Sequence, residues 1–71
     1  METACKEFVK VLKDAERMGS HLNVTQVSKK LSRLPPNSSP MDVFNECKLR
    51  GWVMGSAWGP WLTDEGKKQA N

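Results

Sequence analysis

Residues 44–68 constrain the fold most, because an apolar helical stretch there ends at a glycine and two short apolar segments follow. Phe44 and Cys47 lie three residues apart, the spacing of one helix face. Gly51 comes next, and glycine readily adopts the left-handed conformation that ends many helices. The order of these signals predicts a mainly α-helical domain with one small β-hairpin, an α+β fold. The expected strands are 52–54 and 58–62, and the expected turn is 55–57.

Two helices are expected in the first half of the chain. Apolar residues at helical spacing predict a first helix from Thr3 or Ala4 to Met18, with Gly19 placed to end it. Its expected buried stripe consists of Cys5, Phe8, Leu12 and Ala15, widened by Val9 and Val11. The second helix is expected over 26–32, capped by Thr25, with Val27 and Leu31 facing the core. The segment 21–23 before it is expected to form a short strand.

A third helix is expected after a proline-rich loop. Residues 33–40 contain three prolines and are assigned to the loop. Ser39 is the expected N-cap, Pro40 suits the first helical position, and Asp42 complements the helix dipole. This helix should run to Arg50. Beyond the hairpin, Thr63 is expected to cap a short terminal helix through Lys68, which Gly66 should cause to fray.

The small size of the chain and its few chemically reactive residues limit what it can do. Seventy-one residues make one domain, 1–71, with a modest core. The chain has two cysteines, Cys5 and Cys47, on apolar helix faces and a single histidine, so reduced core thiols are favoured over a disulfide or a metal site. Apolar runs are short and no signal-peptide pattern is present. A soluble cytoplasmic protein without a membrane partner is therefore expected.

Enzymatic chemistry finds no support in the sequence. No Ser/His/Asp or Cys/His arrangement and no glycine-rich phosphate loop is present. Asp64 and Glu65 are adjacent carboxylates, but they lie where a helix begins and complement its dipole. We therefore expect no catalytic residues, no cofactor, no metal and no small-molecule ligand.

Several segments resemble the winged helix-turn-helix superfamily. Arg50-Gly51-Trp52-Val53 is similar to the end of its third helix and the entry into the hairpin called the wing, and Leu62-Thr63-Asp64-Glu65-Gly66 is similar to the exit from the wing. Residues 25–31 look like a typical second helix of the family. The resemblance implies three helices with a short wing. It also implies binding of double-stranded DNA, with the third helix in the major groove and the wing on the adjacent backbone or minor groove.

Small free-standing winged helices are common among regulators of phages and mobile elements, so the resemblance implies transcription regulation, with dimeric or tandem binding. In that role Asn45 is the expected base reader and lysines contact phosphates. The net charge of +3 permits this function without arguing for it. The DNA-binding residues expected are Lys29, Lys30, Arg33, Ser38, Ser39, Asn45, Lys48 and Arg50.

The outward positions of the third helix favour a different partner. Two of these positions are carboxylates and none is a basic residue; they are Asp42, Asn45, Glu46 and Leu49. The turn 55–57 contains no Lys or Arg. The alternative is a protein-interaction module, a small inhibitor or adaptor, or a homodimer, that uses this acidic face and the Trp-rich wing. Its expected interface residues are Asp42, Glu46, Leu49, Met54 and Trp58. The basic residues are about as well explained as an ordinary solvated surface.

The three tryptophans all fall within the expected wing. Trp52 and Trp61 are expected to close the sheet over the helices, because a small core needs their bulk. Trp58, next to the turn, is the one that stays exposed if the wing forms a contact surface. If residues 51–66 form no hairpin, the chain reduces to a three-helix bundle.

Overall fold

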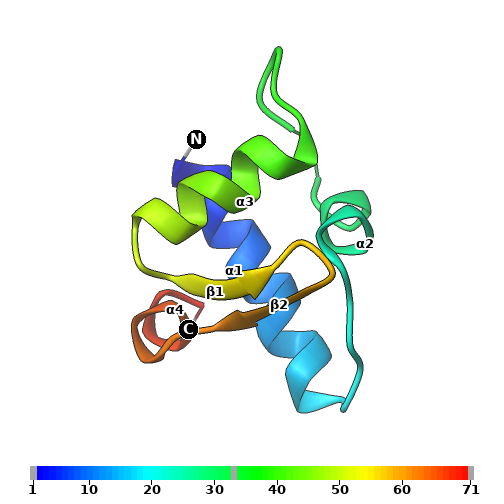
Figure 1. Ribbon diagram of the computed structural model, residues 1–71, viewed down its shortest axis with the longest axis vertical. Helices are drawn as coiled ribbons and strands as arrows, with labels where there is room; N and C mark the ends of the chain where they lie inside the picture. Colours follow the sequence, from blue (N-terminus) through cyan, green and yellow to red (C-terminus); the bar gives the residue numbers. More distant parts are fainter. Residues whose placement is uncertain (1, 33, 71) are drawn as a thin grey trace.

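The computed structural model describes residues 2–32 and 34–70. In these ranges the chain folds into four helices and one antiparallel hairpin (Figure 1). The mainly helical α+β prediction is confirmed, and the three-helix bundle without a hairpin is excluded. The elements in chain order are α1 (Glu2–Arg17), α2 (Val24–Lys29), α3 (Pro40–Leu49), β1 (Val53–Ser56), β2 (Gly59–Leu62) and α4 (Asp64–Gln69).

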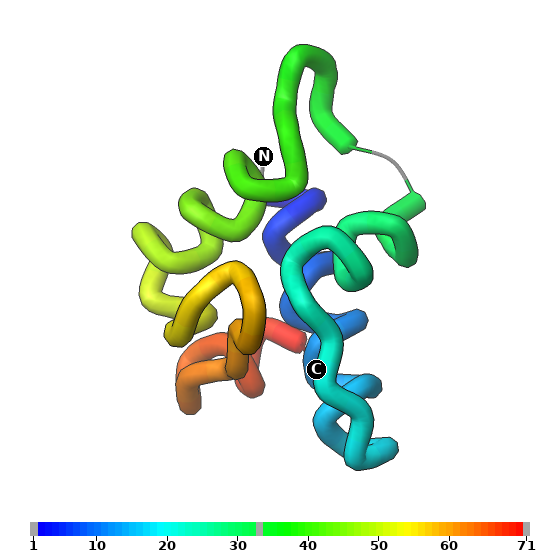
Figure 2. Tube along the Cα trace, turned by 45° about the vertical axis from the view of Figure 1, so that its right-hand side comes forward, coloured from blue at the N-terminus to red at the C-terminus, as the bar shows by residue number. Residues whose placement is uncertain are grey.

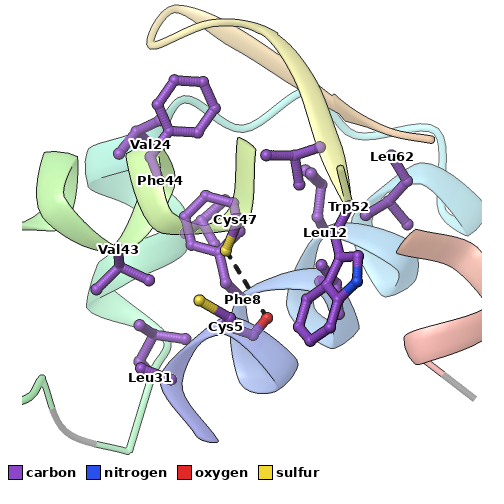
Figure 3. Packing of buried hydrophobic residues seen from close by; sticks show 14 of the residues in the cluster. Cys5, Phe8, Leu12, Val24, Leu31, Val43, Phe44, Cys47, Trp52 and Leu62 are labelled. Carbon is purple, nitrogen blue, oxygen red and sulfur yellow. Dashed lines mark hydrogen bonds between the residues drawn. The ribbon is translucent and has the colours of Figure 1, made fainter. Parts of the chain in front are cut away.

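Helix α1 lies behind α3 and the hairpin in Figure 1, and both cross over it and pack against it. Phe8 of α1 meets Phe44 of α3 with their ring centroids 6.2 Å apart, in the tilted geometry that aromatic pairs favour. Beside them the thiol of Cys47 donates to the carbonyl oxygen of Cys5 at 4.0 Å (Figure 3). Both thiols are buried and free, as predicted. The expected apolar stripe of α1 is buried as well, except that Val11 is only partly covered.

The hairpin turn begins two residues later than predicted. Val53 pairs with Leu62 and Ser56 with Gly59, so Ala57 and Trp58 make the turn and Gly55 belongs to β1. Gly55 has φ +92°, and a β-carbon there would lie 2.7 Å from Cδ1 of Trp61. Glycine thus admits the Trp61 ring from inside the strand, a role that the local sequence does not distinguish from a turn.

The alternation of the two strands separates the tryptophans. Val53 and Leu62 point into the core, as predicted, so their neighbours Met54 and Trp61 pair on the outer face. Trp52 precedes the strand and is buried, with 7% of its surface exposed, whereas Trp61 remains 52% exposed. The prediction that Trp61 closes the core is therefore wrong.

Residues 21–23 form no strand, contrary to the prediction, because the free edge of β2 offers little to pair with. The N–H of Leu62 points away from β1 and donates to the Glu16 carboxylate at 3.1 Å. Two residues earlier on the same edge lies Pro60, which has no N–H. This edge is closed by a side chain and a proline, a common way to keep an edge strand from further pairing.

The N-cap of α2 is Asn23, not the predicted Thr25. The Asn23 side chain accepts from the N–H of Gln26 at 2.8 Å, and the Gln26 side chain accepts from the N–H of Asn23 at 2.9 Å. This reciprocal capping box starts the helix two residues early. The helix also ends early, at Lys29, and Ser32 instead donates its N–H and hydroxyl to the Glu7 carboxylate.

Helix α3 begins as predicted. Ser39 and Asp42 form a capping box and Pro40 occupies the first turn. Arg50 is the C-cap residue, and Gly51 follows with φ +77°, the left-handed conformation expected of it.

Helix α4 is docked rather than frayed. A β-carbon on Gly66 would lie 1.9 Å from the carbonyl oxygen of Trp52, so the glycine allows α4 to pack directly on the backbone that follows α3. Thr63 caps α4 by accepting from the N–H of Gly66, and its hydroxyl donates to the carbonyl oxygen of Gly51 at 2.6 Å. Ala70 ends the segment inside the core. The expected fraying rests on the low helix propensity of glycine, and this close packing of Gly66 opposes it.

Candidate nucleic-acid interface

The turn of the hairpin is fastened to the start of α2. The N–H of Val24 donates to the carbonyl oxygen of Ala57 at 2.9 Å. Figure 2 shows the hairpin turn beside the first residues of α2. Trp58, the second turn residue, points outward with 86% of its surface exposed, as the sequence suggested for this tryptophan alone. Two segments that are distant in sequence therefore meet at the turn that carries this exposed indole.

Both segments lack carboxylates. Residues 18–41 and residues 47–63 contain no Asp or Glu, and all eight acidic residues of the chain lie in α1, α3 and α4. The first segment supplies Lys29 from the last turn of α2, and the second supplies Lys48 from the last turn of α3. We refer to five exposed side chains of these two segments, Thr25, Gln26, Lys29, Lys48 and Trp58, as the α2–hairpin surface.

Helix α3 directs its charges to opposite sides. The Nζ of Lys48 lies 5.3 Å above the centre of the Phe44 ring and donates to the carbonyl oxygen of Gly55 at 3.4 Å, so this ammonium lies on the hairpin side. Glu46 turns the other way and accepts from Nε of Arg50 at 3.0 Å. The acidic and basic residues of α3 are thus separated by the helix itself.

Besides Lys48 and Glu46, three more of the predicted interface side chains are engaged within the fold: Ser39, Asp42 and Arg50. Arg50 binds Glu46, approaches the Glu2 carboxylate at 3.9 Å, and its guanidinium lies 5.4 Å from the Trp52 ring. The Asp42 carboxylate accepts from the N–H of Ser39 at 2.8 Å, and the Ser39 hydroxyl accepts in return from the N–H of Asp42. These contacts satisfy the side chains locally and reduce what each can offer to a partner.

The remaining predicted DNA contacts are distributed unevenly. Lys29 and Asn45 are exposed, and Ser38 is partly covered. Lys30 is exposed but lines a groove between α1 and α2 together with Asp14 and Met18. Arg33 lies outside the described residues.

Sequence reasoning missed Thr25 and Gln26 as interface candidates. Both are exposed in the first turn of α2, beside the hairpin turn. The sequence signal that points to them is the absence of Asp and Glu from residues 18–41. The net charge of the whole chain does not reveal this local absence.

A second basic surface exists on the outer side of α1. Its cations follow helical spacing, so they form one stripe opposite the buried face. Acidic residues of the same helix flank the stripe, and Asp14 binds Arg17 at 3.0 Å. The members of the α1 stripe are Lys6, Lys10, Lys13 and Arg17.

The outer face of the hairpin borders a groove of about 720 Å³. Met54, Pro60 and Trp61 supply its apolar wall, and Glu16 and His21 lie on the side of α1 and the following loop. On α3, Leu49 is 84% exposed. Of the residues proposed from sequence for a protein interface, Leu49, Met54 and Trp58 are exposed and Glu46 is partly covered.

The buried thiols are chemically quiet. Burial is the main reason that the pKa of the Cys5 thiol is raised, and burial together with the hydrogen bond to Cys5 raises that of Cys47 further. Thiols held in the protonated form are poor nucleophiles and poor metal ligands. Within residues 2–32 and 34–70, no cluster of three or more His, Cys, Asp or Glu residues is arranged to hold a metal ion. In the same ranges no helix has the length and apolarity needed to cross a membrane.

Comparison with known protein families, with curated proteins and with solved structures finds no match to this chain.

Proposed function

We propose that this chain is a small double-stranded DNA-binding protein of the winged helix type, the class to which many transcription regulators belong. The observation that carries the proposal is the α2–hairpin surface, where two carboxylate-free segments meet and present lysines from α2 and α3. The element order helix, helix, helix, hairpin supports the winged-helix comparison made from the sequence.

The charge arrangement suits a polyanion on one side of the molecule. Neutralising DNA phosphates with lysines releases condensed counterions and supplies most of the non-specific affinity. Lys29 and Lys48 are the main phosphate contacts in the proposal, and Lys30 and Arg33 extend it. Asn45 is the base reader, because its amide can bond an adenine edge in two places. Glu46, which points away from the hairpin and is paired with Arg50, interferes less than the sequence suggested.

The test is binding of labelled mixed-sequence duplex DNA at low and moderate salt. The wild-type protein should bind tightly at low salt with a steep salt dependence. The double variant Lys29→Ala/Lys30→Ala should weaken binding about equally on all sequences and reduce the salt slope by roughly one unit for each lost contact.

The matched control removes two lysines from the other basic surface. Lys6→Ala/Lys10→Ala changes the net charge by the same amount and leaves the α2–hairpin surface intact. If only this control variant reduces the salt dependence of DNA binding, the DNA binds to the α1 stripe instead. Absence of binding at low salt rejects DNA binding altogether.

A protein partner is the second candidate function, and the exposed apolar side chains favour it. Leu49 is exposed on α3, and the outer hairpin residues Met54 and Trp61 leave apolar area in solvent beside the groove. Large exposed aromatic and methionine side chains are typical anchors at interfaces. Sedimentation over a range of protein concentrations tests the homodimer form of this idea. A monomer at every concentration, unchanged by Leu49→Ala, excludes self-association through this side.

A further inference from the structure

We propose that Trp58 is a base-stacking residue, and that the domain prefers DNA with an accessible base face, at a junction between duplex and single strand, over uninterrupted duplex. This inference rests on the proposed DNA-binding function and specifies its substrate.

The first argument is the exposure and fixed support of the indole. Trp58 is the most exposed large apolar side chain of the described residues, at 86%, although the chain buries Trp52 almost completely. Its support is well held: Ala57 is packed against the core and its carbonyl oxygen accepts the hydrogen bond from Val24. A ring on a fixed two-residue turn loses little conformational entropy when it stacks on a partner.

The second argument is the charge around the turn. Phosphate-gripping turns carry Lys or Arg, whereas residues 55–59 contain neither. The nearest assigned cation is Lys48, whose Nζ contacts the carbonyl oxygen of Gly55 at the base of the turn. No carboxylate occurs in residues 47–63, so a DNA strand that follows Lys48 reaches the indole without meeting an acidic residue of the hairpin. Positive groups that guide the backbone and an aromatic ring that receives a base are the combination used for single strands.

The third argument concerns where a base face is available. Inside a duplex both faces of every base are covered by neighbours, and opening one step costs a few kcal/mol. A blunt end exposes one face of its last base pair, but only at a junction are there also unpaired bases whose faces are free to receive the indole. A single exposed ring can stack there without that cost. The geometry therefore points to junctions, with α3 and Lys48 on the adjoining backbone.

The experiment compares three labelled DNAs of one sequence: a blunt duplex, the same duplex with a short single-stranded overhang, and the single strand. Dissociation constants are measured for the wild-type protein and for Trp58→Ala, Trp58→Phe and Trp61→Ala. Trp61 is the matched control, because it is an exposed indole on the same hairpin but lies on the outer face beside the groove.

The wild-type protein should bind the overhang DNA more tightly than the blunt duplex. Trp58→Ala should lose about fivefold or more in affinity for the overhang DNA and little for the blunt duplex, since one base–aromatic stack is removed. Trp58→Phe should retain most of the preference, and Trp61→Ala all of it.

Equal loss on all three DNAs, or no loss, in Trp58→Ala overturns the stacking role while leaving salt-dependent DNA binding in place. Failure of the wild-type protein to bind any of the three DNAs rejects the proposed function and this inference together. A tryptophan emission that shifts to shorter wavelength with rising protein concentration, without DNA and only when Trp58 is present, assigns Trp58 to a protein contact and also overturns the inference.

Discussion

Val24 donates its backbone N–H to the carbonyl oxygen of Ala57 at 2.9 Å, and this one bond joins the first turn of α2 to the turn of the hairpin. The second turn residue, Trp58, follows Ala57 directly and is 86% exposed. The surface on which the functional proposal depends exists because of this contact.

The start of α2 should depend on Asn23 and not on Thr25. Asn23→Ala removes the side chain that accepts from the N–H of Gln26, and should lower the free energy of unfolding by about 1 kcal/mol. Thr25→Ala changes an exposed residue of the first turn and should stay within about 0.5 kcal/mol of the wild-type value. Urea unfolding followed by tryptophan fluorescence measures both. A larger loss for Thr25→Ala would restore it as the cap.

Gly66 should tolerate no side chain. In Gly66→Ala the new methyl group would overlap the carbonyl oxygen of Trp52, so α4 must move, and the loss of stability should be about 1–3 kcal/mol. Gly59→Ala is the matched control because no atom lies within 4 Å of a β-carbon built there. If thermal unfolding shows equal effects for the two variants, the close packing of α4 on Trp52 is not what fixes the glycine.

The hydroxyl of Ser28 is a weakness in the core. It is buried and has no hydrogen-bond partner among the described residues, whereas the hydroxyl of Ser32 donates to the Glu7 carboxylate. Ser28→Ala removes an unsatisfied polar group and should stabilise the protein by up to about 1 kcal/mol. Ser32→Ala should destabilise it by about 0.5–1.5 kcal/mol. Denaturation midpoints of the two variants on opposite sides of the wild-type midpoint are expected, and a shift of both downward would contradict the assignment for Ser28.

The buried thiols should make the free energy of unfolding decrease at alkaline pH. Burial raises the pKa of Cys5 and Cys47 in the folded chain above the ordinary value of 9.0. The unfolded chain therefore loses the thiol protons first, and the free energy of unfolding falls as the pH rises above about 9 while staying constant with respect to the thiols below it. Each thiol contributes a slope of up to about 1.4 kcal/mol per pH unit.

Urea unfolding from neutral to alkaline pH measures this slope. The Cys5→Ala/Cys47→Ala variant serves as the control, because its overall stability is lower but its alkaline slope should be shallower than that of the wild type. Identical slopes would show that the thiols titrate alike in both states.

The elements that the sequence predicted well are those with local chemical signals. Ser39, Pro40 and Gly51 mark the two ends of α3 through capping and backbone conformation, and each acts as expected. The predictions were wrong where the role of a residue depends on a contact with a residue that is not its neighbour in the chain. Gly55 admits the Trp61 ring and Gly66 admits the Trp52 carbonyl group, and neither role can be read from neighbours in the chain.

The candidate site shows the same division. The exposure of Trp58 agrees with the expectation that this tryptophan stays exposed if the hairpin forms a contact surface, and Lys48 is one of the cations expected from the sequence. The side of α3 on which Lys48 and Glu46 lie depends on Phe44, Gly55 and Arg50, which meet them only in the fold. The helix face that looked acidic in sequence is therefore less uniform in the structure.

The most direct test of the DNA-binding proposal is a nuclear magnetic resonance titration of the isotope-labelled protein with a short duplex at low salt. The account predicts that the amide signals of Lys29 and Lys48 shift, while those of Lys6 and Lys10 on α1 stay unchanged. Shifts confined to α1, or no shifts at any DNA concentration, would contradict it.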